Sequence, residues 1–236
     1  MLQAPLLRSY EVKKMDFIQA ANERHSVRQY LDKPIEQGKA NALNEYINEC
    51  NRSGLHLQLV MNEPKAFDSF MAHYGKFSGV QNYIVLVGKK TADTEEQIGY
   101  YGAKVMLFAQ TLGLNSCWVA LTYKKVKTAF VVEKDEKLYS VIALGYGKTQ
   151  GVAHKSKTAE EVADFGSDSP EWFKSGIQTA LLAPTAMNQQ KFRFSMNHDG
   201  CVSATAGSGF YTKTDLGIAK FFFELGAGAE NVKWVK

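Results

Sequence analysis

Apolar residues recur at helical spacing in several parts of the chain. Ala40, Leu43, Ile47 and Cys50 follow 3-4-3 spacing within residues 36–51, which predicts a helix with one buried face. Residues 95–113 predict the longest helix, with apolar side chains at 3-4-3-4 spacing and Gly113 as its terminator. Further helices are predicted over 16–23, 64–74, 124–130 and 170–182, and from a cap at Thr214 or Asp215 to Leu225.

Other segments show the patterns of strands. LHLQLVM (55–61) and KFRFSM (191–196) alternate with period two, as half-buried strands do, and CVSATA (201–206) could pair with the second. NYIVLVG (82–88) and LYSVIALGYG (138–147) are almost continuously apolar, which is typical of strands buried on both faces. NSCWVALTY (115–123) is predicted to be an apolar turn, and residues 148–168 a polar loop.

One order of elements occurs twice. The helix over 36–51 and the strand over 55–61 are joined by the short NRSG linker, and the helix over 170–182 and the strand over 191–196 by the loop APTAMNQQ. We interpret this as a diverged internal duplication, with residues 1–165 and a truncated copy, 166–236, forming one compact unit. Coincidence stays open, because helix–strand pairs are common.

Composition narrows the class of protein. The 236 residues are 45% hydrophobic and 22% charged, as in ordinary globular domains, and the net charge of +4 is too small to demand a nucleic-acid partner. Three widely spaced cysteines favour free thiols in a reducing compartment. Residues 1–14 lack the apolar core of a signal peptide, and no membrane-spanning run is present, so a soluble cytoplasmic protein is expected.

Several catalytic signatures are absent from the sequence. No GxGxxG lies between a strand and a helix, and no P-loop, HExxH or GxSxG occurs. The five histidines are scattered without ligand spacing, so no metal site is expected. If the protein is an enzyme, a bound cofactor is expected to supply the chemistry, with no catalytic side chain.

Three segments carry candidate binding groups. In RHSVRQY, Arg24 and Arg28 flank His25 and Ser26, a set that suits a phosphate or a planar acceptor edge; a solvated basic turn is the simpler alternative. In APTAMNQQ, the carboxamides carry donors and acceptors in equal number, which fits heteroaromatic edges or ribityl hydroxyls better than bare phosphate. HKSK (154–157) is a second basic cluster, for which a surface role is the alternative.

Together these motifs resemble the FMN-dependent nitroreductase family. RHSVRQYLDKPI (24–35) is similar to its RRSxRxF…KP signature, GYYGAKVMLFAQTLGLNSCW (99–118) to its central helix and GLGxxW turn, VIALGYG with HKSK to its ALGYP strand and basic loop, and APTAMNQQKFRF (183–194) to its APSAxNxQPWxF motif. The family places that last motif in the first third of the chain. Its late position here resembles a single-chain variant, in which a truncated second copy replaces the partner subunit of the usual dimer.

The resemblance implies an α+β nitroreductase-like fold with a central, mostly antiparallel sheet flanked by helices, and one FMN per chain. Arg24, Lys155 and Lys157 would bind the FMN phosphate, and Arg28 would reach the N1/O2 edge of the flavin. His25 and Ser26 would line the phosphate and ribityl region. The remaining expected contacts are the ribityl and ring-edge residues Pro184, Thr185, Ala186, Asn188 and Gln190, and the backbone of Ala120 and Leu121 at flavin N5. Lys191-Phe192 replaces the usual Pro-Trp, and Ala120-Leu121 stands where some members have an acid and a glycine.

The implied activity is ping-pong reduction of nitroaromatics, quinones or similar small acceptors by NAD(P)H, in a monomer or weak homodimer. The alternative that stays open is a flavin-binding carrier or sensor without turnover. A small RNA-binding domain is a third reading, for which KFRF is the only hint.

Overall fold

The computed structural model describes residues 16–164, 166 and 169–235. Its larger sheet has four antiparallel strands in the order β1-β2-β4-β3. The strands are β1 (His56–Val60), β2 (Asn82–Lys89), β3 (Asn115–Val119) and β4 (Glu136–Gly145). The expectation for residues 1–14 lies outside the described residues.

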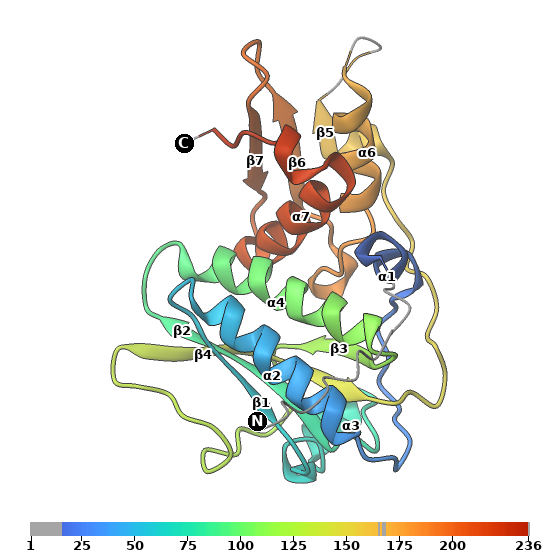
Figure 1. Ribbon diagram of the computed structural model, residues 1–236, viewed down its shortest axis with the longest axis vertical. Helices are drawn as coiled ribbons and strands as arrows, with labels where there is room; N and C mark the ends of the chain where they lie inside the picture. The colour runs from blue at the N-terminus through green and yellow to red at the C-terminus, as the bar shows by residue number, and fades with distance from the viewer. Residues whose placement is uncertain (1–15, 165, 167–168, 236) are drawn as a thin grey trace, which may run out of the picture.

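Helices cover both faces of this sheet (Figure 1). Helices α2 (Gln37–Asn51) and α4 (Thr94–Thr111) cover one face, and α1 (Phe17–Glu23) packs on α4. The short helices η1 (Pro64–Ala66) and α3 (Phe70–Tyr74) lie on the other face. Side chains alternate along a strand, so β2 contributes to a core on each face of the sheet. Ile84 and Leu86 pack in the core under α2 and α4, and Val85 and Val87 pack in the core under η1 and α3. The fold is therefore the predicted α+β sheet with helices on both sides.

The rest of the chain builds a smaller layer beside α4. A three-stranded sheet in the order β5-β6-β7 consists of β5 (Ala163–Asp164), β6 (Phe192–Met196) and β7 (Val202–Ala206). The helices are α5 (Ala159–Val162), α6 (Glu171–Ala180) and α7 (Thr212–Ala227), with the short helices η2 (Ala186–Asn188) and η3 (Ala229–Asn231). Phe223 of α7 stacks on Phe194 of β6 with ring centroids 4.7 Å apart, and it packs edge-on against Phe173 of α6.

Helices α4 and α7 cross at two glycines, and their contacts are reciprocal. A Cβ atom at Gly99 would lie 2.0 Å from O of Thr214, and one at Gly217 would lie 1.9 Å from O of Glu96. Each glycine thus meets the carbonyl three residues before the other. A side chain at either position would push the two backbones apart.

Gly99→Ala and Gly217→Ala should therefore each lower the free energy of unfolding, by about 2 kcal/mol or more, because overpacking forces the helices to shift. Gly38→Ala is the matched control, since no atom lies within 4 Å of its added Cβ in α2 and it should be neutral or slightly stabilising. Urea unfolding of the three variants measures the difference. Equal stabilities would show that the crossing tolerates a wider spacing.

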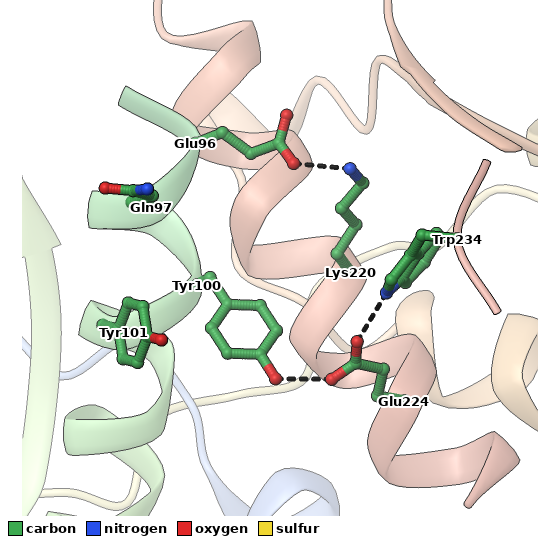
Figure 2. Close-up of a pocket in the computed structure, with 7 residues that line it drawn as sticks. All are labelled: Glu96, Gln97, Tyr100, Tyr101, Lys220, Glu224 and Trp234. Atoms are coloured by element: carbon green, nitrogen blue, oxygen red, sulfur yellow. Dashed lines mark hydrogen bonds and ion pairs between the residues drawn. The ribbon is translucent and has the colours of Figure 1, made fainter. Parts of the chain in front are cut away.

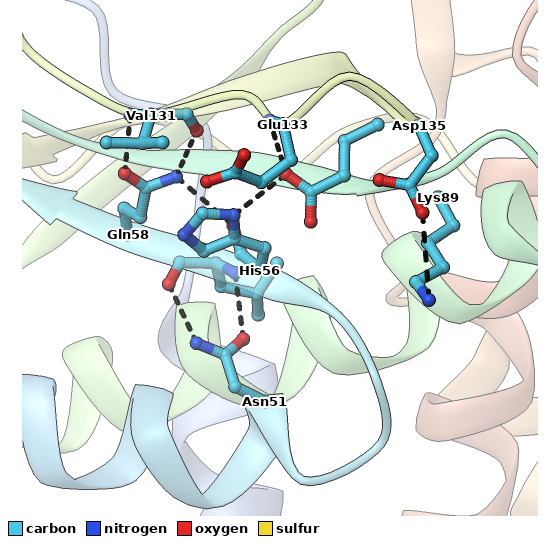
Figure 3. Close-up of polar contacts among 9 residues, drawn as sticks. Asn51, His56, Gln58, Lys89, Val131, Glu133 and Asp135 are labelled. Atoms are coloured by element: carbon cyan, nitrogen blue, oxygen red, sulfur yellow. Dashed lines mark hydrogen bonds and ion pairs between the residues drawn. The ribbon is translucent and has the colours of Figure 1, made fainter.

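The connection from β3 to β4 returns across the sheet to its β1 edge (Figure 3). The side chain of Gln58 donates to O of Val131 and accepts from its N, both at 2.8 Å. Nδ1 of His56 lies 2.9 Å from Oε2 of Glu136, at the start of β4. These contacts cover the edge strand β1. They also fix the C-terminal end of the β3–β4 connection, which begins with Ala120 and Leu121.

Some predicted connections are wrong. NSCWVALTY was predicted as a turn, but its first five residues form strand β3, which pairs with β4. Its short apolar run is buried on both faces and lacks the alternation that would distinguish a strand from a turn. Residues 124–130 form no helix; the lysines there are exposed and only a turn closes, with Ala129 N donating to Val126 O. The predicted helix over 64–74 is split into η1 and α3. The loop over 148–168 contains α5, opened by a capping box of Thr158 and Glu161, and β5.

Candidate flavin site

Arg24 lies at the C-terminal end of α1, where the chain turns into an extended segment beside β3. Ser26 forms a parallel bridge with Ser116, and Val27 N donates to Ser116 O at 3.0 Å. Arg24 is only 4% exposed, and its Nε has no hydrogen-bond partner in the part of the chain described. No carboxylate of the described residues forms an ion pair with it.

The buried positive charge of Arg24 lacks an anionic partner among the described residues. Burial lowers the pKa of Arg24 to about 10, while the smaller effect of Cys117 raises it, so the group stays charged at neutral pH. Oγ of Ser116, one residue before Cys117, is a second buried polar atom without a described partner. An unpaired buried charge is costly, and a multiply charged anion such as phosphate is what this donor set fits.

The neighbouring residues of the RHSVR motif point to the same place. The buried Cys117 thiol interacts electrostatically with Arg28 and Arg24, and Ser26 is bridged to Ser116, the residue before Cys117. His25 is half-buried, with Nδ1 2.9 Å from O of Arg24, and Arg28 is exposed, 6.0 Å from the centroid of the Phe77 ring. Arg24, Ser26 and Arg28 thus gather around one residue of β3.

The loop from Pro184 to Gln190 is held to the HKSK segment by its carboxamides. The buried Gln190 side chain accepts from N of Lys157 at 2.9 Å and donates to O of Lys155 at 2.9 Å and to Oδ1 of Asn188. Asn188 Nδ2 also donates to Lys155 O, at 2.8 Å, and Gln190 N donates to Thr185 Oγ1. Gln190 therefore uses its hydrogen-bonding groups within the chain, as a brace, whereas Asn188 is exposed.

The backbone of this loop is unusual. Met187, Asn188 and Gln190 have φ values of 51°, 54° and 44°, in the left-handed region that costs a non-glycine residue about 1–2 kcal/mol. Lys157 caps the arrangement, with Nζ donating to Gln190 O at 3.0 Å, while the Lys155 side chain is exposed. A strained loop kept in shape by surrounding contacts is a feature of binding sites.

The segment 148–157 joins the two groups of predicted site residues. At one end Lys148 N donates to Gln29 O, and a Cβ on Gly151 would lie 2.8 Å from Cβ of His25. At the other end Lys155 and Lys157 contact the 184–190 loop. Gly151, which contacts His25, and Lys155, which contacts the 184–190 loop, are four residues apart, and four residues span at most about 14 Å. The RHSVR segment and the 184–190 loop therefore lie within the span of one small ligand.

The predicted N5 contacts, Ala120 and Leu121, follow directly after strand β3. Ala120 is half-buried and Leu121 is 69% exposed. Burial raises the pKa of the nearby Tyr123 to about 12, with a smaller effect of Tyr211, the residue that caps α7. The role of Ala120 and Leu121 at flavin N5 stays a prediction.

Sequence reasoning missed Asp215 as a site residue. It was predicted, with Thr214, as a helix cap, but the structure has Tyr211 as N-cap and Asp215 inside the first turn of α7. Asp215 is 2% exposed, and its carboxylate accepts from Ala186 N at 2.9 Å and from Gln189 Nε2 at 2.7 Å. An acidic residue near a helix start is so common that its position gave no distinguishing signal.

A pocket of about 270 Å³ lies elsewhere, between α4 and α7 (Figure 2). Its polar groups already pair with one another: Lys220 with Glu96, and Tyr100 and Trp234 with Glu224. None of the predicted flavin residues lines it. The buried polar atoms without a described partner, Arg24 Nε and Ser116 Oγ, lie instead in the Arg24 region.

The remaining chemistry of the described residues is limited. Within 16–164, 166 and 169–235, no three His, Cys, Asp or Glu side chains converge as metal ligands would. The cysteines Cys50, Cys117 and Cys201 are free thiols. No helix in the described part of the chain combines the length and apolarity needed to cross a membrane.

Comparison with solved structures identifies the fold. A crystal structure of a putative nitroreductase from Thermotoga maritima MSB8 is 19% identical, with a TM-score of 0.68 over 94% of this chain and 88% of that one. A putative NADH dehydrogenase/NAD(P)H nitroreductase from Parabacteroides distasonis is 20% identical, with a TM-score of 0.50 over 64% of this chain and 98% of its own. A putative nitroreductase in complex with FMN from Desulfovibrio desulfuricans is 17% identical, with a TM-score of 0.50 over 65% and 96%.

Comparison of sequences identifies the family. No curated protein matches this chain. The family model described as "Putative TM nitroreductase" matches residues 16–227, nearly the whole chain. The chain therefore belongs to this nitroreductase family.

Proposed function

We propose that this protein is an FMN-dependent oxidoreductase that uses NAD(P)H to reduce nitroaromatics, quinones or similar small acceptors. The observation that carries the proposal is the buried, unpaired Arg24 guanidinium, joined through residues 148–157 to the loop at 184–190. Membership of the nitroreductase family and the FMN complex of the Desulfovibrio desulfuricans protein support FMN as the anion-bearing ligand.

In this proposal the side chains bind and orient, and FMN when bound supplies the hydride transfer between NAD(P)H and the acceptor by a ping-pong sequence. Arg24 and Lys155 would hold the phosphate, with Lys157 bracing the loop. Arg28 would supply positive charge near the ring. Pro184, Thr185, Ala186 and Asn188 would line the cofactor, as His25 and Ser26 would on the other side, and Ala120 and Leu121 would border the ring. No side chain is required as nucleophile or base.

We also propose that the chain is a fused pseudo-dimer holding one FMN. Support comes from the order α2, β1, β2, α4, which α6, β6, β7, α7 repeats with the same antiparallel strand pairing. The reciprocal contacts of Gly99 and Gly217 are those of a two-fold related interface, in which each partner offers the same surface. The Parabacteroides distasonis and Desulfovibrio desulfuricans proteins align over almost their whole length with less than two thirds of this chain. The remaining third of this chain is long enough for a partial second copy.

Reconstitution with FMN tests the function directly. The purified protein should bind one FMN per chain as a monomer or weak homodimer, and NADH or NADPH should bleach the bound flavin anaerobically. Adding a quinone or nitroaromatic should restore the colour. A protein that binds FMN but resists bleaching would support a carrier or sensor, and one that ignores FMN would contradict both functions.

A further inference from the structure

Asp215 is a buried carboxylate that forms no ion pair with any residue in the described part of the chain. Its hydrogen bonds come from neutral donors, the backbone N of Ala186 and the carboxamide of Gln189. Gln189 Nε2 also donates to O of Phe210 at 2.9 Å, so one amide group ties the loop both to α7 and to the segment before it. Burial raises the pKa of Asp215 to about 6, and its two hydrogen bonds oppose that effect.

The surrounding elements do not neutralise this charge. In the loop and in residues 206–215, the charged side chains are Lys191, which donates to Ser208 O, and Lys213, which is exposed. On α4, which crosses α7 nearby, Glu96 pairs with Lys220. Tyr211 contacts the backbone of Asp215, since its O accepts from Asp215 N at 2.9 Å. Both hydrogen bonds of the carboxylate therefore come from the loop.

The loop needs such an anchor because of its backbone. Ala186 and Gln189 bracket Met187 and Asn188, two residues in the left-handed conformation. The two hydrogen bonds to Asp215 grip the loop on both sides of this turn. Releasing them would let the turn relax towards ordinary backbone angles and carry Asn188 out of position.

The pseudo-symmetric position on α4 supplies an internal comparison. The crossing pairs Gly217 with Gly99, so Asp215 corresponds to Gln97, two residues earlier in each helix. Gln97 is exposed and neutral, and the counterpart of the binding loop is only the short linker at 51–54. The buried acid on α7 thus hydrogen-bonds the long loop between α6 and β6, whereas the equivalent position on α4 is an exposed amide.

We propose that Asp215 is the positioning residue of the flavin loop, and that its ionised carboxylate holds residues 186–189 in the shape that binds FMN. This inference rests on the proposed flavin site. A protonated carboxyl is a weaker acceptor for Ala186 N and presents a hydroxyl towards the Gln189 amide. Flavin affinity should therefore fall as Asp215 becomes protonated.

Fluorescence titrations with FMN and riboflavin at pH 5 and pH 7.5 test the inference. Riboflavin is included because the phosphate of FMN also titrates near pH 6. For the wild type, riboflavin affinity should be several-fold weaker at pH 5. In Asp215→Asn both flavins should bind at least 10-fold more weakly at pH 7.5, and the riboflavin pH dependence should disappear; Asp215→Glu should recover part of the affinity.

Asp93→Asn is the matched control, because Asp93 is an exposed cap of α4 without a side-chain hydrogen bond, and its flavin affinity should not change. Wild-type affinity in Asp215→Asn at both pH values, with the wild type binding FMN, would overturn the positioning role alone. Failure of the wild type itself to bind FMN at pH 7.5 would contradict the proposed function and this inference with it.

Discussion

Arg24→Met should weaken FMN binding on the order of 100-fold or more while making the ligand-free protein more stable. Binding falls because a buried phosphate loses its charge-assisted partner. Stability rises because the substitution removes a buried guanidinium whose Nε has no described partner and whose pKa burial has lowered to about 10. Replacing such a charge by an apolar side chain of similar length should contribute about 2–3 kcal/mol.

The opposite signs distinguish a binding residue from a structural one. FMN titration and urea unfolding of the ligand-free protein measure the two effects on the same samples. Arg52→Met is the control, since Arg52 is an exposed residue at the end of α2 and should change neither quantity appreciably. A less stable Arg24→Met protein would mean that Arg24 is paired in the folded chain, contrary to our account.

Asp215→Asn should be more stable than the wild type at pH 8 but not at pH 4. The pKa of Asp215 is raised from 3.8 to about 6 by burial, so the folded protein holds that proton more tightly than the unfolded chain. The stabilisation that protonated Asp215 gives the folded protein is fully present below pH 3.8 and is lost as the pH rises through about 6. Above that range the ionised group costs about 2–3 kcal/mol, which the amide avoids.

Urea unfolding from pH 4 to pH 8 measures this effect as the difference between wild type and variant. The difference should grow between about pH 4 and pH 6 and then stay level. Asp93→Asn, at an exposed position, should show no such growth. A wild type that gains stability over Asp215→Asn with rising pH would show that a cation pairs with the carboxylate. Stability given up at neutral pH for an ordered loop is a known pattern of functional sites.

The sequence predicts the regular elements well where periodicity and burial agree. Helices 36–51 and 95–113 and strands 55–61 and 82–88 are confirmed, because each buries one continuous stripe or both faces. The nitroreductase resemblance is confirmed by the family match. Strand β3 was missed because Asn115–Val119 is buried on both faces and shows no alternation, so its apolar run also fits a turn.

The site could be predicted only in part. Motifs located Arg24, Asn188 and Gln190, but could not show that Gln190 hydrogen-bonds within the chain. Which carboxamide points inward depends on the left-handed backbone of residues 187–190, and no residue type in that stretch demands it. The role of Asp215 in holding the loop could not be predicted, because its partners Gln189 and Ala186 lie 26 and 29 positions away in sequence.

The central claim is that Arg24 binds the phosphate of FMN. FMN and riboflavin differ by that phosphate alone, so the ratio of their affinities isolates the contact. We predict that the wild type binds FMN at least 100-fold more tightly than riboflavin, and that in Arg24→Met the ratio falls below about 10. An equal ratio in wild type and variant would place the phosphate elsewhere and contradict the account.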